Sequence, residues 1–117
     1  MKTILAPTDS SEVSLNAVMY AAELAKLTKS KLILFNVYST PAVTIEIPVF
    51  VPTIESLEEY SMDGLKKIKA DLQLQFDNKL DIECRCALGF EVDKINEYAK
   101  ENNIDLIVMG MKGAGYL

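Results

Sequence analysis

Short runs of apolar residues alternate along this chain with longer segments in which apolar positions recur every three or four residues. An apolar run closed by a turn-forming residue, as Pro7 closes the first one, is typical of a buried β-strand. The run that ends at Leu88 instead alternates apolar and polar residues, the pattern of a strand with one exposed face. We therefore expect four strands, at Thr3–Ala6, Lys31–Val37, Leu80–Leu88 and Leu106–Met109.

The periodic segments between these runs predict helices. In the first of them, Val18, Ala22 and Ala25 belong to one apolar face of a 3.6-residue repeat. Ser10 or Ser11 can cap its first turn, because a serine side chain accepts a hydrogen bond from an unpaired backbone N–H. The helices are expected at Ser11–Thr28, Glu55–Asn78 and Phe90–Asn102.

The alternation of strand and helix predicts an α/β fold: an open parallel sheet with helices on both faces, because parallel neighbours need crossover connections. We expect the strand order 3-2-1-4 in one domain over residues 1–117. Ligands of such sheets bind beyond the carboxyl ends of the strands, where the strand order reverses. Three segments should converge there, namely Pro7–Ser11, the residues after Val37 and the loop that begins at Gly110.

Composition excludes several classes of function. The 117 residues carry a net charge of −5, which disfavours nucleic-acid binding because that binding depends on many Lys and Arg contacts with phosphate. No run approaches the ~18 apolar residues of a membrane span, and no signal-peptide profile opens the chain, so we expect a cytoplasmic protein without a membrane partner. The chain has no histidine, so a catalytic interpretation depends on carboxylates, lysines and hydroxyls.

The two cysteines, Cys84 and Cys86, are two residues apart in a predicted strand. Their thiols should therefore point to the same face as Ile82 and Leu88. Such neighbours are poor disulfide partners, and a zinc site would need more ligands than the chain offers. We expect both to be core residues and predict no metal site.

Two features carry candidate chemistry. Three of the five glycines lie in the last eight residues, directly after the apolar run Asp105–Met109. A buried strand that leads into a glycine-rich turn brings backbone N–H groups close to a phosphate. A simple turn remains the alternative, because the P-loop and G-x-G-x-x-G patterns are absent.

The second feature is Asp9, at the end of the first strand. Its carboxylate could accept hydrogen bonds from a ribose or adenine, or could cap the helix that follows.

The connection from Tyr38 to Ile54 contains three of the four prolines and several large apolar residues. Loops longer than ~12–15 residues without secondary structure are uncommon in compact domains and are usually functional. We expect this connection to cover a ligand or a partner subunit, unless it only packs on its own domain.

Several stretches together resemble the universal stress protein family. They are Thr3–Ser11 (TILAPTDSS), Leu34–Val37, Gly89 with Ile95 and Ala99, and Asp105–Gly113 (DLIVMGMKG). The likeness runs through the whole chain in order, and D-L-I-V-M-G-x-x-G is its most specific part. The resemblance implies the Rossmann-like fold of the adenine nucleotide alpha hydrolases, here without its fifth strand.

The resemblance also implies a function, that of a stress-response regulator that binds ATP or AMP, with or without Mg. Such a regulator acts through contacts with a partner or within an oligomer, and a homodimer is the expected assembly. In ATP-binding members the strand-one aspartate and the strand-two valine lie at the base side, and G-x-x-G begins the phosphate motif. At most slow ATP hydrolysis is expected, since no base or metal cage is visible. Carried over to this chain, the expected contacts are Pro7, Asp9, Val37, Met109, Gly110, Lys112 and Gly113.

The chain departs from the family pattern at its end. The family's phosphate motif finishes with a Gly-Ser/Thr pair on the next helix, whereas this sequence stops at Leu117. We therefore expect a fragment of a longer protein, without the fourth helix and fifth strand and with weakened nucleotide affinity. A defective form of the protein is the alternative. The alternative function is a family member that binds no nucleotide and acts as a dimerisation module. A third hypothesis, an enzyme on the related architecture, lacks both a histidine and an S-G-G-x-D-S-like pyrophosphate loop.

Overall fold

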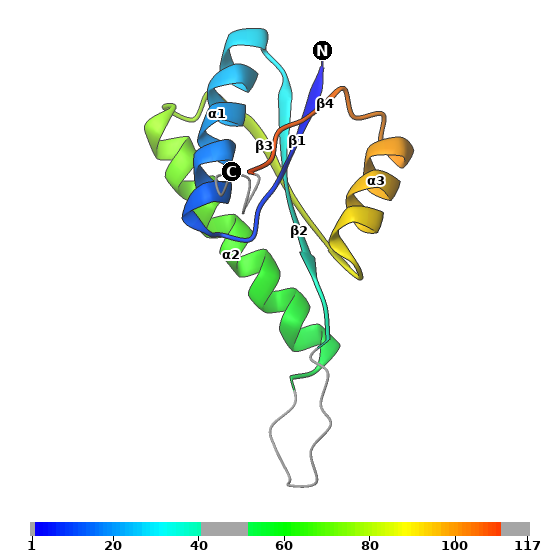
Figure 1. The fold of residues 1–117 in the computed structure, drawn as a ribbon. Coiled ribbons are helices and arrows are strands. Elements are labelled where there is room, and N and C mark those ends of the chain that lie inside the picture. The colour runs from blue at the N-terminus through cyan, green and yellow to red at the C-terminus, as the bar shows by residue number, and fades with distance from the viewer. Residues whose placement is uncertain (1, 41–51, 111–117) are drawn as a thin grey trace, which may run out of the picture.

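A computed structural model of the chain describes residues 2–40 and 52–110 (Figure 1). Strands and helices alternate in the order expected from the sequence. The elements are β1 (Thr3–Pro7), α1 (Glu12–Thr28), β2 (Lys31–Tyr38), α2 (Ile54–Gln75), β3 (Asp81–Leu88), α3 (Glu91–Glu101) and β4 (Leu106–Ile107). Most of the connection predicted to cover a ligand or partner, residues 41–51, lies outside the described residues.

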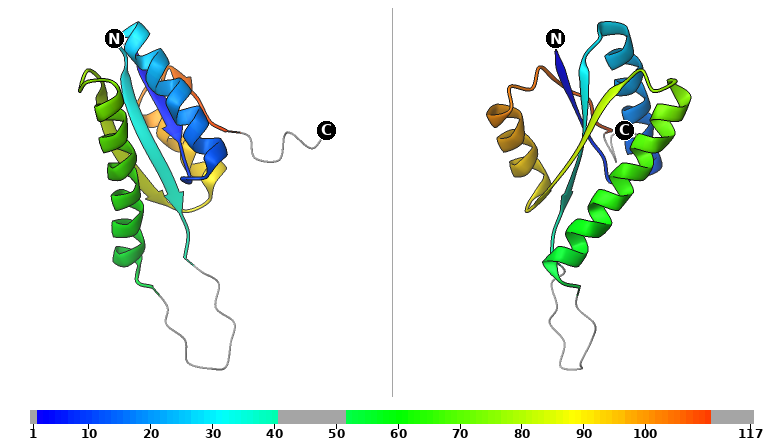
Figure 2. Two further views of the ribbon diagram at one scale, coloured as in Figure 1. Left: turned by 90° about the vertical axis from the view of Figure 1, so that its left-hand side faces the viewer. Right: turned by 180° about the vertical axis from the view of Figure 1, so that it is seen from behind.

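The strands form one four-stranded sheet in the order β3-β2-β1-β4, and every neighbouring pair is parallel. The central pair is in register from Thr3 opposite Lys31 to Pro7 opposite Phe35. Strand order and direction confirm the predicted α/β fold. The carboxyl ends of β1 and β2 therefore open on the same side of the molecule (Figure 2).

The last strand is shorter and more exposed than its sequence predicts. The apolar run Leu106–Met109 indicates a buried strand, but regular pairing covers only Leu106 and Ile107, which are 43% and 38% exposed. The reason is position: within residues 2–40 and 52–110, β4 pairs with β1 alone and lies at the edge of the sheet.

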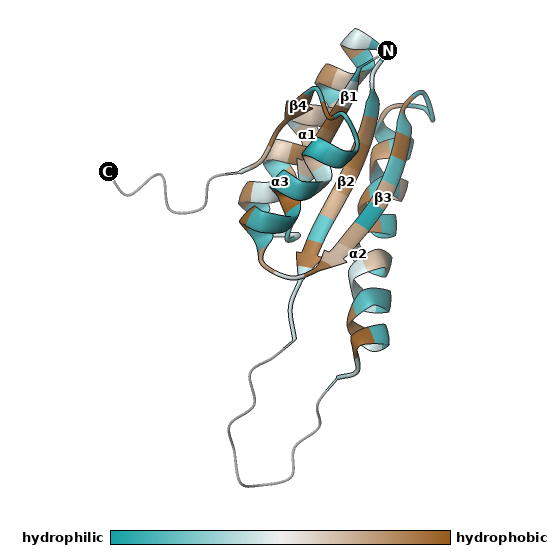
Figure 3. Ribbon diagram, turned by 90° about the vertical axis from the view of Figure 1, so that its right-hand side faces the viewer, coloured by the Kyte–Doolittle hydropathy of each residue, from teal (hydrophilic) through white to brown (hydrophobic). Residues whose placement is uncertain are grey.

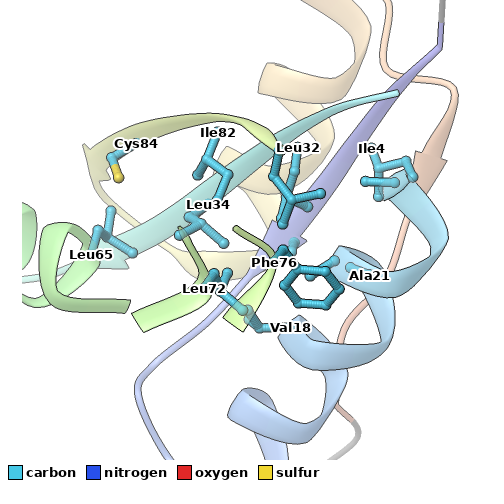
Figure 4. Close-up of a cluster of buried hydrophobic side chains, with 14 residues drawn as sticks. Ile4, Val18, Ala21, Leu32, Leu34, Leu65, Leu72, Phe76, Ile82 and Cys84 are labelled. Atoms are coloured by element: carbon cyan, nitrogen blue, oxygen red, sulfur yellow. The ribbon is translucent and has the colours of Figure 1, made fainter. Parts of the chain in front are cut away.

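The two faces of the sheet are covered by different helices. Because successive strand residues point to opposite faces, Leu32 and Leu34 of β2 face α1 and α2, while Ile33 and Phe35 face α3. Figure 4 shows the larger core, in which Leu34 lies among side chains from both helices. In Figure 3 hydrophobic residues are frequent along the strands, and most of α3 is hydrophilic. Helices on both faces complete the predicted architecture.

The helix ends follow local sequence signals. Ser11, one of the two predicted caps, is the N-cap of α1, and its side chain accepts a hydrogen bond from the backbone N–H of Ser14. Helix α2 ends at Gln75 rather than at the predicted Asn78, because Asp77 and Asn78 adopt left-handed φ values of 54° and 59° that a helix cannot continue.

The cysteines lie where the alternation places them. Cys84 is buried and Cys86 is half-buried, both on the face that packs against α2, and both are free thiols. Burial raises the pKa of each thiol, which keeps both groups in the unreactive protonated form. The prediction of core cysteines is confirmed.

None of the helices in the described residues is long and apolar enough to cross a membrane.

Candidate functional site

A hollow of about 310 Å³ lies at the carboxyl ends of β1 and β2. The N-terminal turns of α1 and α3 border it from opposite faces of the sheet, and the residues that follow β4 border it from the sheet edge. At this point the chain order reverses, since β1 lies between β2 and β4, and open α/β sheets bind their ligands there. The hollow is lined by Pro7, Thr8, Asp9, Ser11, Val13, Ser14, Phe35, Asn36, Val37, Glu91, Ile95, Met109 and Gly110.

The structure brings together most of the residues that the sequence singles out. Pro7, Asp9, Val37, Met109 and Gly110 all line this hollow, although they come from three different strands and their connections. The two other predicted contacts, Lys112 and Gly113, lie outside the described residues.

Asp9 is held by the first turn of α1. Its Oδ1 accepts one hydrogen bond from the backbone N–H of Ser11 at 2.9 Å and another from the Ser14 hydroxyl at 2.8 Å. Hydrogen bonds from the side chain and backbone of Ser11, and then from Ser14, lower the pKa of Asp9 to about 2. The carboxylate is therefore ionised at any physiological pH and can only accept hydrogen bonds.

The turn that carries Asp9 is also fixed from β2 and α2. The Asn36 side-chain amide donates to the carbonyl oxygen of Thr8 at 2.8 Å, and the Ser61 hydroxyl donates to Asn36 Oδ1 at 2.7 Å. The backbone N–H of Thr8 donates to Phe35 O at 2.9 Å. Strand β2 thus holds the β1–α1 turn directly, and α2 supports it through Asn36. A preorganised turn loses little conformational entropy when a ligand binds.

Gly110 passes close to the first turn of α1. A Cβ at this position would lie 2.7 Å from Val13 Cγ1 and 2.8 Å from the Val13 carbonyl oxygen. No side chain fits at that distance, so the close approach of the segment after β4 to α1 requires glycine. Gly110 and Val13, which lie against each other here, both line the hollow.

The remaining walls combine apolar side chains with carboxylates. Val37, Ile95 and Met109 are apolar and suit a flat, weakly polar ring. Asp9 and Glu91 are acidic, and the described lining contains neither lysine nor arginine. Within the described residues no three potential metal-ligating side chains gather at one place.

Ser14 and Asn36 are among the polar residues of this site that sequence reasoning missed. Each had a detectable signal. Asn36 is the only polar residue in the apolar run Leu32–Val37, and Ser14 stands three residues after the N-cap Ser11, the spacing of a capping pair. Their roles depend on partners from other elements, which the sequence pattern does not specify.

A second hollow, of about 390 Å³, adjoins the first and shares Asp9 and Asn36 with it. It lies between the ends of β1 and β2 and the first half of α2. Tyr38, Tyr60, Ser61, Asp63 and Lys67 are among its lining residues. Asp9 and Asn36 therefore separate two hollows rather than line a single one.

Known proteins resemble this chain over its whole length. The sequence profile of the universal stress protein family matches residues 1–117. A universal stress protein from Methanocaldococcus jannaschii is 31% identical over 119 residues, which cover 96% of this chain and 65% of that relative. The chain thus spans slightly less than two thirds of the length of this relative.

Solved structures show the same fold. The crystal structure of a universal stress protein in complex with cAMP is 29% identical to this chain, with a TM-score of 0.65 over 92% of this chain and 75% of that one. A protein of the universal stress protein family from Burkholderia pseudomallei is 21% identical, with a TM-score of 0.69 over 94% of this chain and 81% of that one. At that identity the second likeness concerns the fold alone.

Proposed function

The chain belongs to the universal stress protein family, and we propose that it binds an adenine nucleotide, ATP or AMP, in the hollow at the carboxyl ends of β1 and β2. Occupancy of the hollow would then regulate contacts with a partner or with a second copy of the chain during a stress response. Nucleotide binding, rather than catalysis, is the activity proposed.

One observation carries this proposal: residues from three separate segments meet in one hollow at the reversal of strand order. Asp9 follows β1, Val37 lies in β2, and Gly110 follows β4. Apolar walls suit a purine ring, and an ionised carboxylate suits the hydroxyl groups of a ribose or the amino group of adenine. The relative solved in complex with cAMP gives independent support for an adenine nucleotide at this fold.

The residues suggest which part of the nucleotide lies where. The backbone N–H of Ser11 and the Ser14 hydroxyl both donate to Oδ1 of Asp9, and neither donates to Oδ2. We assign Oδ2 to a donor on the sugar or base. The phosphates are assigned to the loop that begins at Gly110, since the described walls elsewhere carry the carboxylates of Asp9 and Glu91.

Asp9→Ala should weaken ATP and AMP binding by roughly tenfold or more, because a hydrogen bond to a charged group contributes about 1.5–3 kcal/mol. Calorimetric titration of the wild type and the variant measures the effect. Asp93→Ala is the matched control: it removes the same charge from the first turn of α3, and Asp93 is not among the lining residues. Equal affinities for the wild type and Asp9→Ala would remove Asp9 from the site.

A second candidate function, an interaction module, has its own supporting observation at the sheet edge. Leu106, Ile107 and Met109 are apolar and each more than a third exposed, and β4 has one strand neighbour in the described ranges. Exposed strand edges pair readily with another chain. We therefore propose self-association along β4, alongside nucleotide binding or in place of it.

The oligomeric state tests this second candidate. Light scattering of the wild type should give a mass above that of one chain at micromolar concentration, and Ile107→Glu should lower it by placing a charge on the apolar edge. Leu27→Glu, on the exposed outer side of α1, serves as the control and should leave the mass unchanged. A monomeric wild type across a concentration series would exclude the edge as an association site.

A further inference from the structure

Ser14 is the centre of a hydrogen-bond cluster beneath Asp9. Its side chain is buried, and its Oγ lies 2.8 Å from Asp9 Oδ1 and 2.8 Å from Thr8 Oγ1. The backbone N–H of Asp9 also points to it, at 3.3 Å. Thr8 is buried as well, and the N–H of Ser10 donates to its Oγ1 at 3.1 Å.

The hydroxyl protons of this cluster can be assigned by starting at the Asp9 carboxylate. Asp9 is ionised and can only accept. The Ser14 hydroxyl has two acceptors in reach, Asp9 Oδ1 at 2.8 Å and the Ser11 carbonyl oxygen at 3.1 Å, and we assign its single proton to the shorter bond to the charged group. Ser14 Oγ must then accept from the Thr8 hydroxyl. The N–H of Ser10 in turn donates to Thr8 Oγ1, so this chain of hydrogen bonds runs towards the carboxylate. The Ser11 hydroxyl also donates to Ser14 Oγ, over a longer distance of 3.3 Å.

The two oxygens of the Asp9 carboxylate have different surroundings. Two donors, Ser14 Oγ and the Ser11 N–H, converge on Oδ1. Together they restrict rotation of the carboxyl group, and neither donates to Oδ2, so Oδ2 can accept a hydrogen bond from a ligand in the hollow.

We propose that Ser14 is a positioning residue, which orients the carboxylate of Asp9 so that Oδ2 is presented to a bound nucleotide. This inference rests on the proposed function for its ligand, but the orientation of Asp9 exists without the ligand. Ser14 itself acts through Asp9 and needs no contact with the nucleotide.

Other ionisable groups near Asp9 do not confound a test of Ser14. They come from several elements and would stay in place if only the Ser14 hydroxyl were removed. They are Glu91 on α3, Tyr38 on β2, and Tyr60, Asp63 and Lys67 on α2.

The first arm of the test uses the protein without nucleotide. Titration of the Asp9 carboxyl carbon by NMR should show its pKa rising in Ser14→Ala, since one of the hydrogen bonds that lower it is lost. Ser30→Ala is the matched control, because Ser30 is also a buried serine but follows the opposite end of α1, where it bonds Thr28. An unchanged Asp9 titration in Ser14→Ala would overturn the inference, whether or not the protein binds nucleotide.

The second arm is a double-mutant cycle with AMP. Ser14→Ala should lower AMP affinity by roughly fivefold to tenfold in the wild-type background and by less than about twofold in the Asp9→Ala background, because Ser14 acts through Asp9. Unfolding midpoints of all variants establish that each is folded. Equal losses in both backgrounds would overturn the inference, because Ser14 would then act independently of Asp9. A wild type that binds no AMP would overturn the proposed function instead, and the titration above would still decide the role of Ser14.

Discussion

Gly110→Ala should abolish most of the adenine-nucleotide affinity, with a loss of at least roughly tenfold, and should also destabilise the fold by about 1–3 kcal/mol. The added methyl would lie 2.7 Å from Val13 Cγ1 and 2.8 Å from the Val13 carbonyl oxygen. The Val13 side chain can rotate away, but its backbone carbonyl cannot, so the segment after β4 must move away from α1. That movement widens the hollow between Gly110 and Asp9, where the proposed ligand is held.

Gly64 provides the matched control for this substitution. It lies inside α2, and a Cβ there would meet no atom within 4 Å. Gly64→Ala should therefore stabilise the protein by about 0.5–1 kcal/mol through the helix preference of alanine and leave nucleotide affinity unchanged. Calorimetric titration and thermal unfolding of both variants give the comparison. If Gly110→Ala binds nucleotide as the wild type does, the close approach to α1 has no role in the site.

Leu34→Ala should be the most destabilising single substitution of this set, at about 2–5 kcal/mol of the ~5–15 kcal/mol that stabilises a typical domain. Leu34 is fully buried in the central strand β2 and belongs to the core between the sheet and the helices α1 and α2 (Figure 4). Its truncation leaves a cavity that the strand pairs on both sides prevent from closing.

Chemical denaturation of Leu34→Ala and of Leu27→Ala measures this effect. Leu27 lies on α1 but is 82% exposed, so the same truncation there should change the free energy of unfolding by less than about 0.5 kcal/mol. Similar losses for the two variants would mean that the core between the sheet and these helices is not packed as described.

The fold was predictable because its signals are local. The alternation of apolar runs with 3.6-residue periodicity separates strands from helices, and the parallel order follows from the crossover helices. The length of β4 was not predictable in the same way. Leu106–Met109 is as apolar as the run in β2, but strand pairing depends on which neighbours lie beside it, and β4 has β1 on one side.

The candidate site was predictable only in part, for a related reason. The sequence left Asp9 open between a helix cap and a ligand contact. The structure assigns the cap to Ser11, while one oxygen of Asp9 accepts from both the Ser11 N–H and the Ser14 hydroxyl in the first turn of α1. Ser14 and Asn36 could not be assigned, because their partners come from separate elements that meet only in the folded chain.

The packing of Gly110 against another element also could not be predicted from the sequence. Its sequence context predicts a glycine that lets a ligand approach the backbone. The described neighbour is instead the first turn of α1, at Val13, so packing alone already requires glycine at this position. A contribution to ligand binding adds to that requirement and has to be measured separately.

The central claim, that an adenine nucleotide binds at the carboxyl ends of β1, β2 and β4, is tested most directly by mapping amide NMR shifts as AMP is added to the wild-type protein. We expect saturable shifts at Thr8, Asp9, Val37 and Gly110, which surround the hollow, and none at Ser30, which lies at the opposite end of the sheet beside the start of β2. An absence of saturable shifts, or shifts confined to residues away from the hollow, would contradict the account.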